Sequence, residues 1–263
     1  MLAAVDVSCS LDLVADGPAL LGLQVVPVGG VGQLELTQDG QPLAWQEHDS
    51  DAGGRTQVVQ VAAGEIQIRY TGRVPERPEG TASPSAHERL VALRPSRYCP
   101  SDRTLGLAVE LLGTVPDDHG ERALAVAARV RERTAYVLGS SGGSDDALDT
   151  LLSGRGVCRD FAHLVVMLCR SLDVPARMVS VYAPGLSPMD FHAVAEVAVD
   201  GCWQLLDATG LAPRPSMARI ATGRDAADTA FLTNIGADVV LTGYQVTAVA
   251  VGDLPQDRPV ALA

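Results

Sequence analysis

The sequence contains no lysine. All 20 of its basic residues are arginine, set against 32 Asp and Glu residues, which gives a formal net charge of −12. The absence of lysine excludes enzymes that form a Schiff base through a lysine amine, and it excludes Walker loops, which need a lysine for the phosphates. Because nucleic acids and anionic membranes are bound through clustered cations, the acidic balance also argues against nucleic acid and membrane surfaces as partners.

Aromatic residues, cysteine motifs and long apolar runs are also scarce or missing. Aromatics make up 4% of the chain, so a core has to be built mainly from Ala, Val and Leu. No stretch approaches the roughly 20 apolar residues that span a bilayer, and the first residues lack the basic segment of a secretory signal. The five cysteines, Cys9, Cys99, Cys158, Cys169 and Cys202, include no Cys-x-x-Cys pair. Their spacing speaks against a disulfide framework and a zinc knuckle, and we expect a cytoplasmic protein.

The chain changes character near residue 85. Up to about Tyr70 it consists of short apolar runs separated by glycine-rich turns, which predicts an antiparallel β module. A stretch rich in Pro, Gly and Ser over 74–86 predicts a linker. The predicted strands of this first part span residues 5–13, 19–28, 33–36, 57–61 and 65–70.

After the linker the pattern becomes helical and later returns to strands. Helices are predicted over 101–112, 120–133 and 145–152, with Ser101 or Asp102 and then Ser144 as N-caps. Strands are predicted over 176–182, 192–199, 202–207 and 239–251. Because strands and helices do not alternate one for one, the fold class is α+β rather than a doubly wound sheet. We predict an N-terminal β domain with linker over 1–85, and a second domain of helices packed on an antiparallel sheet over 86–263.

The most informative segment is GRGVCRDFAHLVVMLCRSL at 154–172. Apolar residues recur at helical spacing from Phe161 to Leu172, and two glycines precede the run, so Cys158 is predicted in the first turn of a helix. Unpaired N–H groups and the positive end of the helix dipole favour a thiolate at that place. The segment therefore predicts a nucleophilic thiol at Cys158.

A second segment, DFHAVAEVAVDGCWQLLDAT at 190–209, predicts a hairpin. Asp-Gly between two apolar runs favours a two-residue turn, with Val199 opposite Cys202. In that register His192 is the diagonal neighbour of Asp207 on one face of the sheet. Diagonal Cβ atoms lie about 7–8 Å apart, close enough for a carboxylate to accept a proton from an imidazole. Together with the thiol, this pair predicts a nucleophile, a base and a group that orients the base.

Three blocks of the chain resemble the transglutaminase-like superfamily: GVCRDFAHL around Cys158, DFHA around His192, and WQLLDAT around Asp207. Segments 94–102 and 219–228 are also similar to bacterial members. The resemblance implies a papain-like catalytic domain preceded by a β domain, and it makes Cys158 the nucleophile, His192 the base and then the acid, and Asp207 the third member. Many members carry Trp two residues after this histidine, where the chain has Val194.

The reaction expected from these residues is cleavage of an amide bond through a thioester. The expected enzyme is a cysteine peptidase or amidase that acts on a peptide or amide substrate without a cofactor or metal. A transamidase or amide-forming acyltransferase would use the same chemistry, and a binding or assembly module that only keeps the fold is the alternative from another class. The sequence leaves open whether the chain forms a homo-oligomer.

Other polar residues have structural explanations. Cys169 lies mid-helix and Cys202 just past the turn, so both are expected to have structural roles. His163 follows Cys158 by five helical residues and points about 140° away, which argues against a shared zinc ion. The pairs at 117–118 and 145–146 are more typical of helix caps or solvated charge than of cation ligands. Tyr98 and Asp102 fit either a cleft wall or a turn.

Overall fold

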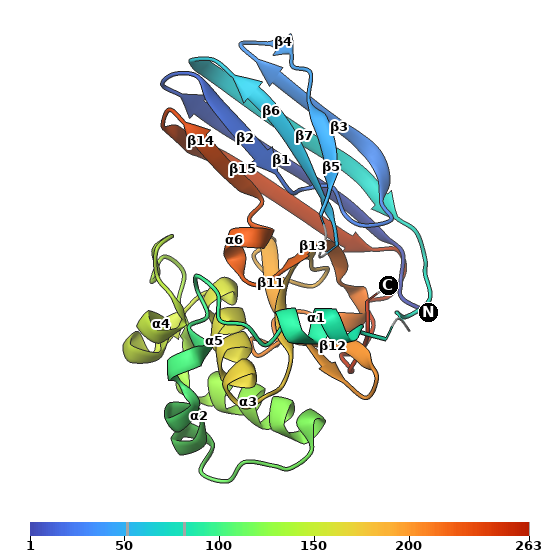
Figure 1. The fold of residues 1–263 in the computed structure, drawn as a ribbon. Coiled ribbons are helices and arrows are strands. Elements are labelled where there is room, and N and C mark those ends of the chain that lie inside the picture. The colour runs from blue at the N-terminus through green and yellow to red at the C-terminus, as the bar shows by residue number, and fades with distance from the viewer. Residues whose placement is uncertain (51–52, 81–82, 263) are drawn as a thin grey trace.

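The computed structural model describes residues 1–50, 53–80 and 83–262. Residues 81 and 82 of the predicted linker and residue 263 of the predicted second domain lie outside the described residues. Figure 1 shows two parts stacked end to end, a long β sandwich above and a mixed part of helices and a sheet below. The α+β fold class is therefore confirmed.

The sandwich consists of two antiparallel sheets whose dry faces share one core. One sheet has the order β15-β1-β7-β3-β4 and the other the order β14-β2-β6-β5. Along β7, buried Ile66, Ile68 and Tyr70 alternate with exposed residues, as one dry face requires. They pack in a core that includes Leu11 and Leu21. The bounds are β1 Val5–Ala15, β2 Ala19–Leu23, β3 Val31–Gln38, β4 Gln41–Pro42, β5 Gln46–Asp49, β6 Arg55–Val61, β7 Gly64–Val74, β14 Leu232–Gly236 and β15 Val239–Ala250.

Two strands from the end of the chain complete this sandwich. β15 pairs along the whole of β1, from Val5 opposite Ala250 to Ala15 opposite Val239, and β14 pairs with β2. The strand over 239–251 was correctly predicted as a strand, but its assignment to the second domain is wrong, because its hydrogen-bonding partner is β1. The division of the chain into two domains at residue 85 stays a prediction. β14 and β15 follow residue 85 but pair with strands of the first part.

The lower part packs helices on a four-stranded antiparallel sheet with the order β12-β11-β10-β13. α5 lies across this sheet and contacts both β11 and β10, while α3 and α4 pack on α5. The sequence did not predict α1 or β13. The bounds are α1 Ala86–Val91, α2 Leu105–Leu112, α3 His119–Arg133, β8 Ala135–Tyr136, α4 Ala147–Ser153, β9 Arg155–Gly156, α5 Cys158–Ser171, β10 Ala176–Tyr182, β11 Phe191–Val199, β12 Cys202–Leu206, β13 Ala218–Gly223 and α6 Ala226–Thr229.

α5 is buried on all sides, not only along its apolar stripe. Every residue from Asp160 to Ser171 is buried, including the charged Arg170. Its guanidinium donates to the carbonyl oxygens of Ala92, Ala176 and Arg224, which supply acceptors for the buried charge. A helix enclosed in this way fixes the position of its first turn, because it cannot rotate without unpacking the core.

The hairpin of β11 and β12 has the predicted register. Val199 lies opposite Cys202, and the pairing continues to Ala195 opposite Leu206. Asp200 and Gly201 at the turn have φ of 51° and 75°. Both values are in the left-handed region that a two-residue turn of this kind requires, so the Asp-Gly pair determines the register.

Two predicted helix starts are wrong. Residues 101–103 form a single 3₁₀ turn, and α2 starts only after Thr104. α4 is capped by Asp146 rather than by Ser144, since the Asp146 carboxylate accepts the N–H groups of Leu148 and Asp149. Several polar residues stand in a row at both places, and sequence alone does not show which of them turns its side chain to the helix.

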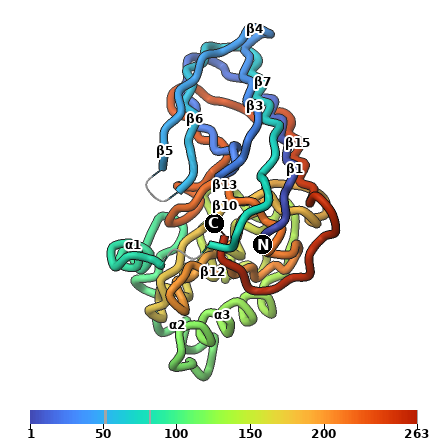
Figure 2. Tube along the Cα trace, turned by 90° about the vertical axis from the view of Figure 1, so that its right-hand side faces the viewer, coloured from blue at the N-terminus to red at the C-terminus, as the bar shows by residue number. Residues whose placement is uncertain are grey.

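The segment after β15 joins the two parts. Figure 2 shows it running from the end of β15 down to β12, beside the N-terminus. There the N–H of Leu205 in β12 donates to the carbonyl oxygen of Val260 at 2.9 Å, and Arg214 forms an ion pair with Asp257 of the same final segment. In the described part of the chain, no helix has the length and apolar character needed to cross a membrane.

Candidate active site

Cys158 is the first residue of α5, as predicted. Val157 precedes it in an extended conformation, and its N–H donates to the Asp160 carboxylate at 2.8 Å. β9 leads into this turn and pairs with β8, where Tyr136 lies opposite Gly156. The Cys158 side chain is half-buried and lines a cleft, whereas Cys169 in the same helix is fully buried.

The hairpin brings His192 and Asp207 together. His192 stands near the start of β11 and Asp207 directly follows β12, and the His192 Nε2 atom lies 3.1 Å from Asp207 Oδ2. The other carboxylate oxygen accepts the N–H and the hydroxyl of Thr209, at 2.8 and 2.7 Å. Asp207 is therefore held from one side and orients the imidazole from the other.

The surroundings of this pair stabilise its charged form. Burial disfavours the imidazolium, but the hydrogen bond to Asp207 and the neighbouring Cys158 thiol outweigh it and raise the pKa of His192 to about 10. Burial likewise opposes the Asp207 carboxylate, yet the contacts with His192 and Thr209 leave its pKa below the usual value. The pair is thus an imidazolium and a carboxylate at neutral pH.

The second ring nitrogen of His192 has no partner of its own. Nδ1 is buried and, within the described ranges, accepts or donates no hydrogen bond. Since Nε2 faces a carboxylate, the ring donates from Nε2, and the proton on Nδ1 is the one that can be exchanged. His192 and Cys158 line the same cleft, so that exchange would take place at the cleft.

The cleft lies where the two parts of the molecule meet, and its volume is about 480 Å³. The lower part contributes Cys158, His192 and Met178, and the segment and strands that return to the sandwich contribute Phe231, Leu232 and Tyr244. Most of the wall is apolar, and Arg159 and Asp190 supply additional charges. A cleft of this size admits a peptide side chain together with its backbone.

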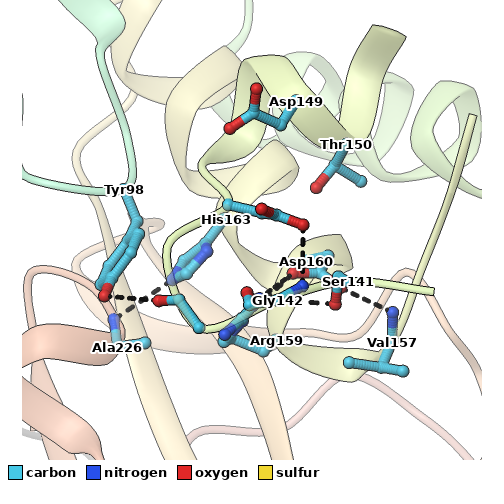
Figure 3. A network of polar contacts seen from close by, with 12 residues as sticks. Tyr98, Ser141, Gly142, Asp149, Thr150, Val157, Arg159, Asp160, His163 and Ala226 are labelled. Atoms are coloured by element: carbon cyan, nitrogen blue, oxygen red, sulfur yellow. Dashed lines mark hydrogen bonds and ion pairs between the residues drawn. The ribbon is translucent and has the colours of Figure 1, made fainter. Parts of the chain in front are cut away.

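The wall beside Cys158 is held by a polar network that Figure 3 shows. Arg159 donates to the carbonyl of Gly142 at 2.6 Å, and Tyr98 donates to the carbonyl of Gly143 at 2.9 Å. Asp160, which is fully buried, accepts hydrogen bonds from Ser141 and Arg159. The loop over 141–143 is therefore tied to the first turn of α5.

His163 belongs to the back of this network and not to the cysteine. Its ring stacks on Tyr98 with centroids 5.1 Å apart, and Nε2 accepts the N–H of Ala226 at 3.2 Å. Burial lowers the pKa of His163 to about 4, so the ring is neutral at pH 7. The His163 ring therefore helps to fix Tyr98, which lines the cleft. Asp102, the other residue that the sequence offered for the cleft wall, is not among the lining residues.

Sequence reasoning missed Tyr136, Asp160 and Asp190 as neighbours of the candidate site. Burial, together with the nearby Cys158 side chain, raises the pKa of Tyr136 to about 12. Asp160 had a usable signal, because an Asp three residues after the N-cap commonly accepts N-terminal N–H groups. Tyr136 had none, since its proximity arises from the pairing of β8 with β9, whereas Asp190 stands only two residues before His192 in the sequence.

Comparison with known proteins was consistent with this geometry. Residues 106–208, about two fifths of the chain, match the core model of the transglutaminase-like superfamily. A candidate cysteine protease from Cytophaga hutchinsonii has a similar structure, with a TM-score of 0.87, 28% identity, and coverage of 98% of this chain and 94% of that one. The resemblance to the superfamily is confirmed for the core, and the fold of this neighbour includes the sandwich.

Two further proteins are similar over smaller parts. An uncharacterised protein of Mycobacterium leprae is 37% identical over 93 residues, which are 34% of this chain and 32% of the relative, so the match spans about a third of that protein. The periplasmic domain of TgpA from Pseudomonas aeruginosa has a TM-score of 0.41 at 18% identity, covering 75% of this chain and 91% of that domain.

Proposed function

We propose that this protein, whose residues 106–208 carry a transglutaminase-like core, is a cysteine-dependent hydrolase of amide bonds. Cys158 is its nucleophile, His192 its base and then its acid, and Asp207 the group that orients the imidazole. One observation carries the proposal: an imidazole held by a carboxylate at 3.1 Å, whose second nitrogen has no hydrogen-bond partner among the described residues, lines the same cleft as the cysteine at the helix start.

The electrostatics support a thiolate and an imidazolium in the resting enzyme. With a pKa raised to about 10, His192 is protonated at neutral pH. Cys158 is the first residue of a buried helix, and the free N–H groups and dipole of a helix start favour the negative charge of a thiolate. The proton of Cys158 would then already reside on His192 before substrate binds.

The reaction proceeds in two steps. The Cys158 thiolate attacks the amide carbon, and the C–N bond breaks as His192 gives its proton to the departing amine, which leaves a thioester. His192 then takes a proton from water, the hydroxide adds to the thioester and displaces the Cys158 thiolate, and the acid product leaves. The oxyanion donors in this proposal are the Cys158 N–H and the phenol of Tyr136, which lies near Cys158.

The test begins with acylation, which does not depend on substrate specificity. Mixing the protein with 4-nitrophenyl acetate should release one equivalent of nitrophenolate in a burst, and mass spectrometry should place the acetyl group on Cys158. Cys158→Ala should abolish the burst, whereas Cys202→Ser should keep it. A burst that persists in Cys158→Ala, or no burst from the folded unchanged protein, would contradict the proposal and favour a binding module.

Hydrolysis is then read from a panel of internally quenched peptides. We expect cleavage by the unchanged protein and a loss of at least about 1,000-fold in Cys158→Ala, as is typical when a nucleophile is removed. Adding an amine such as hydroxylamine separates hydrolysis from acyl transfer to an amine. Complete diversion of the thioester to the amine at millimolar concentration would identify a transamidase instead.

A further inference from the structure

Two of the charged side chains that line the cleft form direct ion pairs within the protein. Arg159 pairs with buried Asp160 at 2.9 Å, and His192 pairs with Asp207 at 3.1 Å. Asp190 also lines the cleft; among the described residues no arginine or histidine nitrogen lies within ion-pair distance of it, although the charge of nearby His192 acts to lower its pKa. Asp190 is therefore a carboxylate of the cleft wall that, within the described ranges, no arginine or histidine contacts directly.

Asp190 is held in place by neutral donors. Its Oδ1 accepts the N–H of Phe191 at 2.7 Å, and its Oδ2 accepts the Tyr244 hydroxyl, from β15 of the sandwich, at 3.1 Å. Burial raises the pKa of Asp190, although the hydrogen bond from Tyr244 opposes this. A half-buried carboxylate without a counter-ion gains most from a bound cation, because the cation offsets the lost hydration.

The position of Asp190 selects the part of a substrate that it can meet. Asp190 directly precedes β11, two residues before His192, and both side chains line the cleft. His192 is the group that protonates the departing amine in the proposed reaction. Asp190 would therefore lie beside the segment that follows the scissile amide.

Aromatic rings continue the wall next to this carboxylate. Phe191 stacks on Phe231 with centroids 4.8 Å apart and planes 16° apart, and both rings line the cleft together with Tyr244. Ring faces accept the methylene stem of a lysine or arginine and attract its charged end. A carboxylate beside such rings is suited to an alkylammonium or a guanidinium group.

We propose that the cleft contains a cation subsite, centred on Asp190 and flanked by Phe191 and Tyr244, which takes the side chain of a lysine or arginine directly after the scissile amide. This assignment rests on the proposed function, because it uses the direction in which His192 delivers its proton. The protein would accordingly be a hydrolase of basic peptides.

The subsite can be tested through the thiol without any peptide. Cys158 would be modified with 2-aminoethyl methanethiosulfonate, which is cationic, and with neutral methyl methanethiosulfonate, and the adduct rates measured by mass spectrometry. We expect the ratio of cationic to neutral rate to fall about tenfold in Asp190→Asn, the size of one charge acting across a partly solvated cleft. Glu110→Gln, an equal charge change on exposed α2, should leave the ratio unchanged.

A second measurement uses the unchanged protein, so that it stands even if Asp190→Asn does not fold. n-Butylammonium should protect Cys158 from the neutral reagent at concentrations where n-butanol does not. With peptides, kcat/KM should be about tenfold higher for lysine than for uncharged norleucine after the scissile amide, and Asp190→Asn should remove that difference. Glu110→Gln, which leaves the cleft unchanged, should retain the preference.

The outcomes separate the two proposals. If Cys158 reacts quickly with both reagents at rates that Asp190→Asn does not alter, and butylammonium gives no protection, the cation subsite is wrong while the reactive thiol stands. If Cys158 reacts with neither reagent faster than Cys202 does, the proposed function itself is wrong.

Discussion

His192 and Asp207 form a buried pair across the β11–β12 hairpin, with Nε2 and Oδ2 3.1 Å apart and side chains 0% and 3% exposed. The Asp200-Gly201 turn sets the register, and the register carries the carboxylate to the ring. Two groups that are fifteen residues apart in sequence thus become neighbours through local geometry alone.

Replacing Asp207 by asparagine keeps the shape and removes the charge. An amide orients the imidazole in the wrong tautomer and no longer stabilises its charged form, so kcat should fall by about 10³- to 10⁴-fold. The pKa of His192, followed by NMR, should fall as well, because the contact that raises it is weakened. Asp200→Asn, the same change at the exposed turn, serves as the control, and an equal loss in both variants would contradict the assigned role.

The raised pKa of His192 makes stability depend on pH. Because the folded-state pKa is about 10 and that of an unfolded histidine about 6.5, the contribution is full below pH 6.5 and is lost as pH rises toward 10. The free energy of unfolding of the unchanged protein should therefore exceed that of His192→Gln by a few kcal/mol more at pH 6 than at pH 10. Urea unfolding at both pH values measures this; a constant difference would contradict the charged pair.

Much of this site could be predicted because its determinants are local. The helix start at Cys158 follows from helical spacing after two glycines, and the pairing of His192 with Asp207 follows from one turn. The cleft wall follows from no local pattern. Tyr244 reaches Asp190 only because β15 returns to pair with β1. The sequence of a strand does not show which distant strand it pairs with, so this contact could not be predicted.

The burial of Asp160 was equally hidden. A capping aspartate has the same sequence signature whether it is exposed or enclosed, and here it is enclosed by Ser141 and Arg159. Asp160→Ala should leave the arginine charge and the Val157 N–H without a partner and destabilise the protein by about 3–5 kcal/mol. Ser141→Ala removes one neutral donor and should cost only about 1 kcal/mol. Urea unfolding of both variants checks this, and equal small losses would show that the network is solvated.

The hairpin turn can be tested with glycine substitutions. Gly201 has a φ of 75°, so Gly201→Ala should destabilise by about 1 kcal/mol, and Gly201→Asn should cost less because asparagine tolerates this region. Gly106 in α2 provides the opposite case. A Cβ there meets no atom within 4 Å, and alanine should stabilise the helix by up to about 1 kcal/mol. Thermal unfolding measures the loss of stability at Gly201 and the gain at Gly106. If Gly201→Ala left stability unchanged, the left-handed conformation of the turn would be contradicted.

The most direct measurement of the central claim is the rate at which iodoacetamide alkylates each cysteine between pH 5 and 9, with the adducts located by mass spectrometry. We predict that Cys158 reacts fast and nearly independently of pH below pH 7, as an existing thiolate would, and that His192→Ala slows it toward the rate of half-exposed Cys202. A Cys158 rate that rises with pH in parallel with Cys202 and does not change in His192→Ala would contradict a thiolate–imidazolium pair.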